Sequence, residues 1–187
     1  MKEMNRKMNT LKLFSETKND KLLTLTYSIY KNMFRCYINV MDKDFKNREF
    51  LTSVALTPIN ARMISNELTK LPKLKEPYEF ELKLFGAKYV DDKREEGRTK
   101  TGSIKIMKAK NKDGDLVNVI QIVDKIDKQY NFVLKNTPYV DIYVNGNKIT
   151  DMSKISNTWC NSYAKTFSDV LSLIPESVEQ ESPVTNF

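Results

Sequence analysis

Alternating apolar and polar residues mark a pair of strands near the start of the chain. In the segment Lys21–Tyr30 (KLLTLTYSIY) every second residue from position 23 is apolar or aromatic, and Phe34–Val40 repeats the pattern after a turn at Lys31-Asn32. Successive side chains of a strand point to opposite faces of a sheet. The pattern therefore predicts a hairpin with one buried and one solvated face, preceded by a shorter alternation at residues 11–14.

A third strand leads into a helix. Phe50–Leu56 has a β-like pattern, and Thr57-Pro58 then supplies an N-cap residue followed by proline at the first helical position. In the segment TPINARMISNELTKL the apolar residues fall at helical spacing until Pro72 ends the pattern. The sequence thus predicts a β-meander and one helix up to about residue 74.

The second half of the chain varies this order. Tyr78–Leu84 alternates as a strand, while the charged stretch VDDKREEGRTKTGS after Gly86 predicts a mobile loop. Ile104–Lys110 and Leu116–Val123 flank an Asp113-Gly114 turn and predict two further strands. Because Leu116–Val123 is apolar on both faces, we expect it at the centre of a sheet or at an interface.

The pattern changes from strands to a long helix toward the end. Tyr130–Lys135 and Tyr139–Val144 continue the β pattern up to a tight-turn signal at Asn145-Gly146. From Ser153 to Ile174 apolar residues recur three or four positions apart, which predicts an amphipathic helix that ends before Pro175. Its aromatic residues form a stripe that is typical of core packing: Trp159, Tyr163 and Phe167.

Grouped strands followed by a helix indicate an α+β fold, with antiparallel sheets and two packed helices. We expect one domain over residues 1–174, with two degenerate pseudo-repeats at about 11–74 and 75–174, and a flexible acidic tail at 175–187. The sequence contains neither a dinucleotide-binding glycine motif nor a phosphate-binding loop.

The amino-acid composition limits which partners, catalytic groups and metal sites the protein can have. The 187 residues include 31 Lys and Arg against 24 Asp and Glu, a net charge of +7, which raises the expectation of a polyanionic partner. The absence of histidine excludes Ser-His-Asp and Cys-His nucleophile systems and His-ligated zinc. The two cysteines, Cys36 and Cys160, are too few for a four-thiolate site and lie in apolar patterns typical of buried, reduced thiols.

Targeting signals are missing from the sequence. No apolar run approaches the roughly 20 residues needed to cross a bilayer, and the first residues have neither the apolar core nor the cleavage site of a signal peptide. We therefore expect a cytoplasmic protein without membrane association. We also expect no enzymatic activity, no cofactor and no metal.

The segment from Phe34 to Leu71 resembles the single-stranded-DNA-binding transcriptional coactivators and the Whirly proteins. The shared pattern is an alternating strand, MDKD, a polar turn, a strand ending VALTP, and the helix INARMISNELTKL. Whirly proteins carry this sheet-plus-helix unit twice, which would cover most of residues 11–174. The resemblance implies curved antiparallel sheets and sequence-tolerant binding of single-stranded DNA.

The last thirteen residues, PESVEQESPVTNF, carry a second resemblance. They are proline-flanked and acidic, contain no Lys or Arg, and end on phenylalanine, like the tails of bacterial and phage single-stranded-DNA-binding proteins. The resemblance implies recruitment of replication or recombination partners, in a bacterial or phage-infected cell. The residues it assigns to that role are Glu176, Glu179, Glu181 and Phe187.

Single-strand binding needs cations along the phosphates and exposed aromatics on which bases stack. The polar face of the first hairpin and the basic residues from the charged stretch onward offer this mixture. Our predicted contacts are Lys21, Tyr30, Lys31, Arg35, Tyr37, Arg94, Arg98, Lys100, Lys105, Lys108 and Lys110. An ordinary solvated β face with tyrosines at its edge explains the first hairpin equally well.

Two other functions stay open. A protein-interaction module, such as a viral accessory or host-takeover factor, would use the same basic surface against an acidic protein. A metal-dependent nuclease would use aspartate pairs as magnesium ligands, although aspartate is also expected at turns. Those pairs are Asp42 with Asp44, Asp91 with Asp92, and Asp113 with Asp115. Oligomeric state and a preference for DNA over RNA are not fixed by the sequence.

Overall fold

The computed structural model describes most of the chain. The described residues are 9–16, 21–30, 33–42, 50–91, 93–137 and 139–172, and at 9–16, 28–30, 33–35, 50 and 89 only the backbone is described. The predicted tail and its four residues, Glu176, Glu179, Glu181 and Phe187, lie outside these ranges, as does Lys31.

The first half begins with a four-stranded antiparallel sheet in the order β1-β2-β3-β4. Its strands are β1 (Asn9–Glu16), β2 (Lys21–Tyr30), β3 (Met33–Asp42) and β4 (Phe50–Leu56). The predicted inward residues Leu23, Leu25, Cys36, Ile38 and Val40 are all buried. The predicted hairpin is therefore confirmed, together with the strand that follows it.

The helix α1 (Pro58–Lys70) begins where the cap signal predicts. The hydroxyl of Thr57 accepts a hydrogen bond from the backbone N–H of Asn60 at 3.2 Å, which satisfies one of the free donors at the helix start. A short 3₁₀ turn, η1 (Leu71–Lys73), contains Pro72 and ends the helix. Thr57 and Pro58 thus set the start of α1, as predicted.

The second half contains another antiparallel sheet, in the order β5-β6-β7-β8. Its strands are β5 (Tyr78–Val90), β6 (Lys93–Lys110), β7 (Leu116–Val123) and β8 (Gln129–Val133). Strand β7 lies between β6 and β8 and is buried on both faces from Val117 to Val123. Its two-sided apolar pattern therefore marks a central strand.

A small hairpin and a long helix complete the described chain. The hairpin consists of β9 (Tyr143–Val144) and β10 (Asn147–Lys148), joined by Asn145 and Gly146 at φ 50° and 79°. The strand predicted over Tyr139–Val144 is wrong except at its last two residues. The helix α2 (Met152–Leu171) begins after Asp151, whose carboxylate accepts from the N–H of Lys154 at 3.0 Å.

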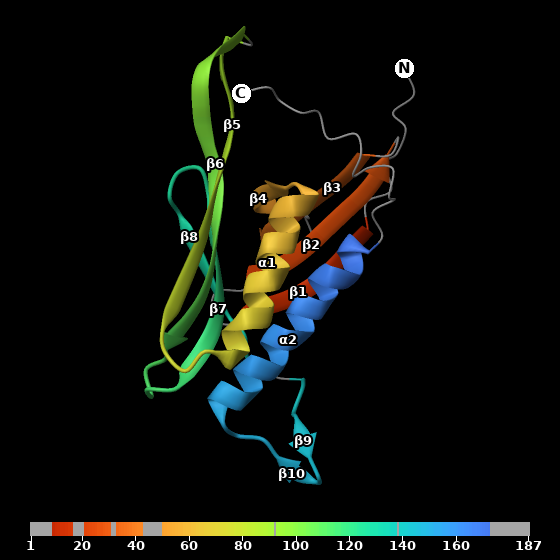
Figure 1. Cartoon of the computed structure of the whole chain (residues 1–187), viewed down its shortest axis with the longest axis vertical. Helices are drawn as coiled ribbons and strands as arrows, with labels where there is room; N and C mark the ends of the chain where they lie inside the picture. The colour runs from red at the N-terminus through yellow and green to blue at the C-terminus, as the bar shows by residue number, and fades with distance from the viewer. Residues whose placement is uncertain are drawn as a thin grey trace.

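The two helices lie side by side and share one core with both sheets (Figure 1). Two hydrogen bonds join the helices directly: Ser65 Oγ donates to the carbonyl of Ala164, and Cys160 Sγ to that of Leu68, each at 3.1 Å. Tyr163 and Phe167 are buried in this core, and the half-buried Trp159 donates to Asn136 at 2.9 Å. The aromatic stripe of α2 is thus core, as predicted.

The molecule is an α+β protein with antiparallel sheets, as the grouping of strands predicts. Each half places a four-stranded meander before a helix, which is the order that two pseudo-repeats require. No helix among the described residues is long and apolar enough to cross a bilayer.

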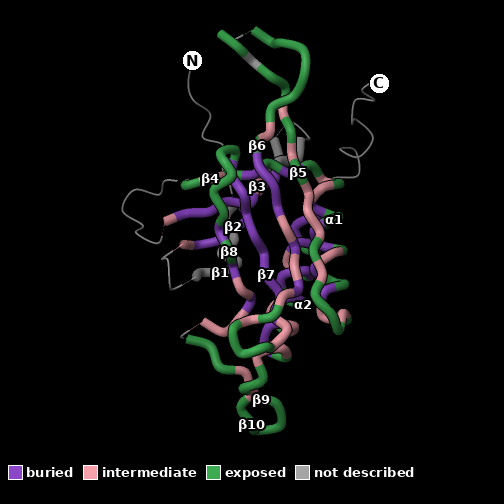
Figure 2. The backbone as a smooth tube through the Cα atoms, turned by 90° about the vertical axis from the view of Figure 1, so that its left-hand side faces the viewer, coloured by how far each residue is buried: buried purple, intermediate pink, exposed green. Residues whose placement is uncertain are grey.

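The charged stretch after Gly86 is not a loop, and this prediction is wrong. It forms the outer part of β5 and β6, which pair as far as Val90 and Lys93. We call residues 85–101 the arm. It projects beyond the rest of the described fold (Figure 1), and every side chain described from Ala87 to Thr99 is exposed (Figure 2). Because both faces of the arm meet water, its strands carry no apolar alternation.

A bulge separates the arm from the body of the sheet. Leu84 pairs with Gly102 and Phe85 pairs with Lys100, so Thr101 is an extra residue in β6. Gly102 has φ 152°, and a Cβ on it would lie 2.9 Å from the carbonyl oxygen of Val123. Only glycine fits this position without strain, and the close approach fixes where the arm leaves the body.

Candidate nucleic-acid interface

The polar face of the first hairpin is not solvated, contrary to our prediction. Thr26 and Asn39 are each only 1% exposed, and Thr24 is buried with them. Asn39 Nδ2 donates to Thr26 Oγ1 at 2.9 Å, and Ser53 Oγ donates to Asn39 Oδ1 at 2.7 Å. These bonds across β2, β3 and β4 satisfy the side chains of Thr26, Asn39 and Ser53 without water, whereas the buried Thr24 Oγ1 has no hydrogen-bond partner among the described residues.

The structure places the predicted DNA contacts of this hairpin in different surroundings. Lys21 forms an ion pair with Asp42 at 2.7 Å, its register partner on β3. Tyr37 is half-buried. The backbones of Tyr30 and Arg35 lie at the end of the β2–β3 hairpin, but their side chains are outside the described part of the structure. Of the predicted hairpin contacts whose side chains are described, Lys21 and Tyr37, it is Tyr37 that lines the groove described below.

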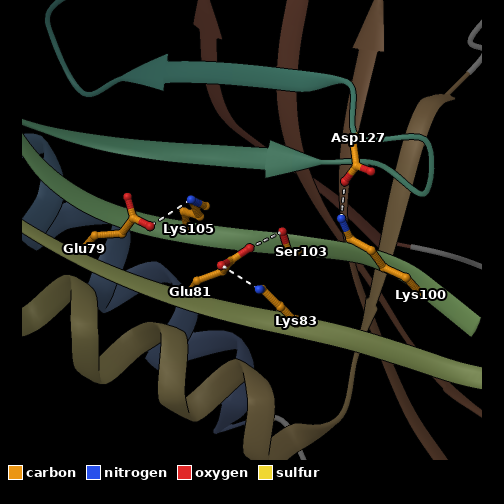
Figure 3. A network of polar contacts seen from close by, with 7 residues as sticks. All are labelled: Glu79, Glu81, Lys83, Lys100, Ser103, Lys105 and Asp127. Carbon is orange, nitrogen blue, oxygen red and sulfur yellow. Dashed lines mark hydrogen bonds and ion pairs between the residues drawn. The ribbon is translucent and has the colours of Figure 1, made fainter. Parts of the chain in front are cut away.

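Two of the predicted cations lie in a network of ion pairs around the outer face of the second sheet (Figure 3). Lys105 binds Glu79 at 2.8 Å, and Lys100 binds Asp127. In the same network Glu81 accepts from Ser103 and lies 3.5 Å from Lys83. Because each of these lysines already faces a carboxylate, this face offers little net positive potential to a phosphate.

Lys108 is not a surface residue, and its predicted role in phosphate binding is wrong. It is 3% exposed, and its ammonium donates to the carbonyl of Leu71 at 2.9 Å and to Asn157 at 3.4 Å. Burial lowers the pKa of this ammonium. The side chain therefore supports the end of η1 and its contact with α2. Lys110, two residues further on, is exposed.

The arm holds the remaining predicted cations and an aromatic residue that sequence reasoning missed. The guanidinium carbon of Arg98 lies 4.0 Å from the ring centroid of Phe85, a cation–π arrangement. Phe85 is 42% exposed. Its place after the alternating segment Tyr78–Leu84 gives no sequence signal for exposure, and its contact with Arg98 depends on strand register.

Charge pairing within the arm decides which cations are available. Lys88 binds Glu95 at 2.6 Å, and Lys100 is held by Asp127. Within the described part of the chain, no carboxylate forms an ion pair with Lys93, Arg94 or Arg98. Within the arm, Arg94 and Arg98 are therefore the predicted contacts whose charge is not paired with a described carboxylate.

A groove of about 500 Å³ lies at the base of the arm. It is enclosed by the last residues of β4, the start of α1, and the bulge region of β5 and β6. Tyr37 from the first sheet and Phe85 from the arm both line it. The complete lining is Cys36, Tyr37, Ser53, Ala55, Leu56, Thr57, Pro58, Asn60, Leu84, Phe85, Gly86 and Thr101.

The groove has no evident reactive group. Burial raises the pKa of Cys36 to about 12, so its thiol is protonated and a poor nucleophile near neutral pH. Tyr37 is the second aromatic wall, and Ser53 and Thr57 already use their hydroxyls in the hydrogen bonds described above. The lining therefore fits a flat, uncharged group held by contact.

Of the aspartates considered as magnesium ligands, Asp44 and Asp92 lie outside the described residues, and Asp42, at the end of β3, forms an ion pair with Lys21. Asn111 accepts from the N–H groups of Asp113 and Asp115, in an ordinary turn network. Asp91 occupies a left-handed turn position with φ 48°. Within the described ranges, no three Asp, Glu or Cys side chains are grouped as metal ligands.

The chain matches no protein-family model, and a search of curated proteins finds no match. Function therefore has to be inferred from the residues themselves.

Proposed function

We propose that the protein binds single-stranded DNA with little sequence preference. The observation that carries this proposal is the exposed Phe85 ring with Arg98 stacked on it. It lies at the base of an arm in which Lys93 and Arg94 form no ion pair with a described carboxylate. Sequence-tolerant binding of single strands uses this combination of aromatic platforms and cations, because every base has a π face and every nucleotide a phosphate.

The fold is consistent with this function. The order of a four-stranded antiparallel meander and a helix, found twice, is what the resemblance to Whirly proteins implies. We propose a Whirly-like architecture on this basis. We further propose a role in replication or recombination in the cytoplasm of a bacterial or phage-infected cell, with the acidic tail recruiting partners.

A competition titration tests the proposal. A fluorescent single strand of about 30 bases, longer than the roughly 4–16 nucleotides of a typical single-strand site, is bound to the full chain. It is then challenged with unlabelled single strand or unlabelled duplex. We expect the single strand to displace the label at much lower concentration than the duplex. Equal competition by the duplex would contradict the proposal.

A protein-interaction module is the second candidate, favoured by the hairpin β9–β10 and the segment before it. Tyr139 is 94% exposed, and Tyr143 and Val144 are also exposed. An exposed aromatic patch on a projecting hairpin is typical of protein interfaces. This function predicts poor binding of the labelled strand even at low salt.

A further inference from the structure

The groove at the base of the arm differs in charge from its surroundings. None of the described residues that line it is charged, whereas Arg98 lies over the lining residue Phe85. We propose, on the basis of the proposed binding of single strands, that this groove takes one nucleobase of the bound strand. The phosphates that flank this base then lie along the arm, near Arg98 and Arg94.

The size and lining of the groove fit a base better than a phosphate. Its volume of about 500 Å³ falls in the range of small-molecule clefts, roughly 300–1,000 Å³. A phosphate placed inside would lose its hydration without gaining a cation from the lining. A base is flat and uncharged, and it gains contact with Tyr37 and Phe85.

The two aromatic walls each leave a surface for stacking. Arg98 covers one face of Phe85, so a base can stack only on the other face. Tyr37 pairs across the strands with Ala55, which is exposed and lines the groove. The small Ala55 side chain leaves room beside Tyr37. β4 and β5 are each an edge strand of their sheet, so each has one side without a hydrogen-bonded strand among the described residues.

Close packing of β4, β5 and β6 forms the base of the groove. A Cβ on Gly86 would lie 3.2 Å from Thr101 Cγ2, and a Cβ on Gly102 would lie 2.9 Å from the carbonyl oxygen of Val123 and 3.3 Å from Val54 Cγ2. The last distance shows that β6 lies close to β4 of the first sheet next to the base of the arm. A preformed site lowers the entropic cost of ordering a flexible strand.

A cycle of two changes tests base insertion, one in the protein and one in the strand. Phe85→Ala removes the ring, and a strand of equal length built from abasic linkers removes the bases but keeps the phosphates. We expect Phe85→Ala to weaken binding of the normal strand about five- to a hundredfold, the loss of one stacked base. We expect the same variant to bind the abasic strand as the unchanged protein does.

A second variant fills the groove without touching Phe85. Ala55→Leu adds an apolar side chain at an exposed position of β4 and leaves all charges in place. We expect it to weaken binding of the normal strand severalfold and to spare the abasic strand. Thermal melting of both variants by circular dichroism checks that the fold is retained.

Matched controls separate base contacts from phosphate contacts. Phe85→Trp keeps an aromatic platform and should retain the preference for the normal strand. Arg94→Gln should weaken binding of the normal and the abasic strand by the same factor, because Arg94 is expected to contact phosphates, which both strands contain. Tyr139→Ala removes an exposed aromatic residue far from the arm and should change neither affinity.

The outcomes distinguish this inference from the proposed function. If the unchanged protein binds the normal strand, but Phe85→Ala and Ala55→Leu affect the normal and abasic strands equally or not at all, base insertion is wrong and single-strand binding stands. If the unchanged protein binds neither strand at low salt, the proposed function is wrong and the inference with it.

Discussion

Arg98 stacks on Phe85 across the two strands of the arm, with its guanidinium carbon 4.0 Å from the ring centroid. The contact follows from the bulge at Thr101, which changes the register so that Arg98 pairs with Ala87 instead of Lys88. Ala87 lies two residues after Phe85, so Arg98 and Phe85 share one face of the arm. A planar guanidinium on a ring preorganises both groups, because each limits the rotamers of the other. The arm thus presents an aromatic surface and a charge at one point.

Two substitutions of Arg98 distinguish the contribution of its charge to oligonucleotide binding from the contribution of its stacking on Phe85. Arg98→Lys keeps the charge but loses the planar contact, and Arg98→Gln loses both. We expect Arg98→Gln to weaken oligonucleotide binding about two- to fivefold and Arg98→Lys to weaken it less, since an exposed cation–π contact is worth about 0.5–1 kcal/mol. Fluorescence anisotropy titrations measure both. If Arg98→Gln binds the oligonucleotide with wild-type affinity, Arg98 does not contribute to the interface.

The salt dependence of binding should reveal which lysines and arginines touch phosphate. Each phosphate contact with a single strand adds about 0.7 to the slope of log affinity against log salt concentration. We expect Arg94→Gln to reduce the slope by about this amount. Lys105→Gln is the control, because Lys105 already faces Glu79 at 2.8 Å, and it should leave the slope nearly unchanged. If Lys105→Gln reduces the slope and Arg94→Gln leaves it unchanged, the strand binds to the outer face of the second sheet and not to the arm.

The junction between arm and body should tolerate no side chain. Gly102→Ala places a Cβ 2.9 Å from the carbonyl oxygen of Val123 at a φ of 152°, and we expect it to cost about 1–3 kcal/mol in the free energy of unfolding. Gly97→Ala is the matched control, because Gly97 also has a positive φ but no atom within 4 Å of the added Cβ. Urea unfolding should show the larger loss for Gly102→Ala.

The buried thiols should make the protein sensitive to alkali. Burial raises the pKa of Cys36 from 9.0 to about 12. Between these values the unfolded thiol ionises while the folded thiol stays protonated, so stability that is fully present below 9.0 is lost as the pH rises.

A single substitution isolates this effect. From about pH 8 to about pH 10 the wild type should lose about 1 kcal/mol more of its unfolding free energy than Cys36→Ala does. Urea unfolding at the two pH values measures the difference. An equal pH dependence of the two proteins would show that Cys36 does not contribute.

Local patterns in the sequence were enough to predict the main elements. The period of two in β2 and β3, and Thr57-Pro58 before α1, each act within a few residues, and the structure confirms them. The two-sided apolar run of β7 predicted either a central strand or an interface, and the structure places it between β6 and β8. These signals depend on short-range sterics and on burial, which a single chain segment carries by itself.

The errors concern features that depend on distant segments. The side chains described from Ala87 to Thr99 are exposed, so the charged strands of the arm lack apolar alternation and were predicted to form a loop. Thr26 and Asn39 satisfy each other across strands, and Lys108 finds the carbonyl of Leu71, 37 positions away, so polar residues that read as solvated are buried. Phe85 and Arg98 meet only through a register that the bulge sets.

The most direct test of single-strand binding is a salt-resolved anisotropy titration. The full chain is titrated into a labelled strand of about 30 bases and into the duplex of the same sequence, at about 50 mM and about 200 mM salt. We predict tight binding of the single strand at the lower salt, a loss of affinity of at least tenfold at the higher salt, and weaker binding of the duplex throughout. Absence of single-strand binding at the lower salt, or equal affinity for the duplex, would contradict the account.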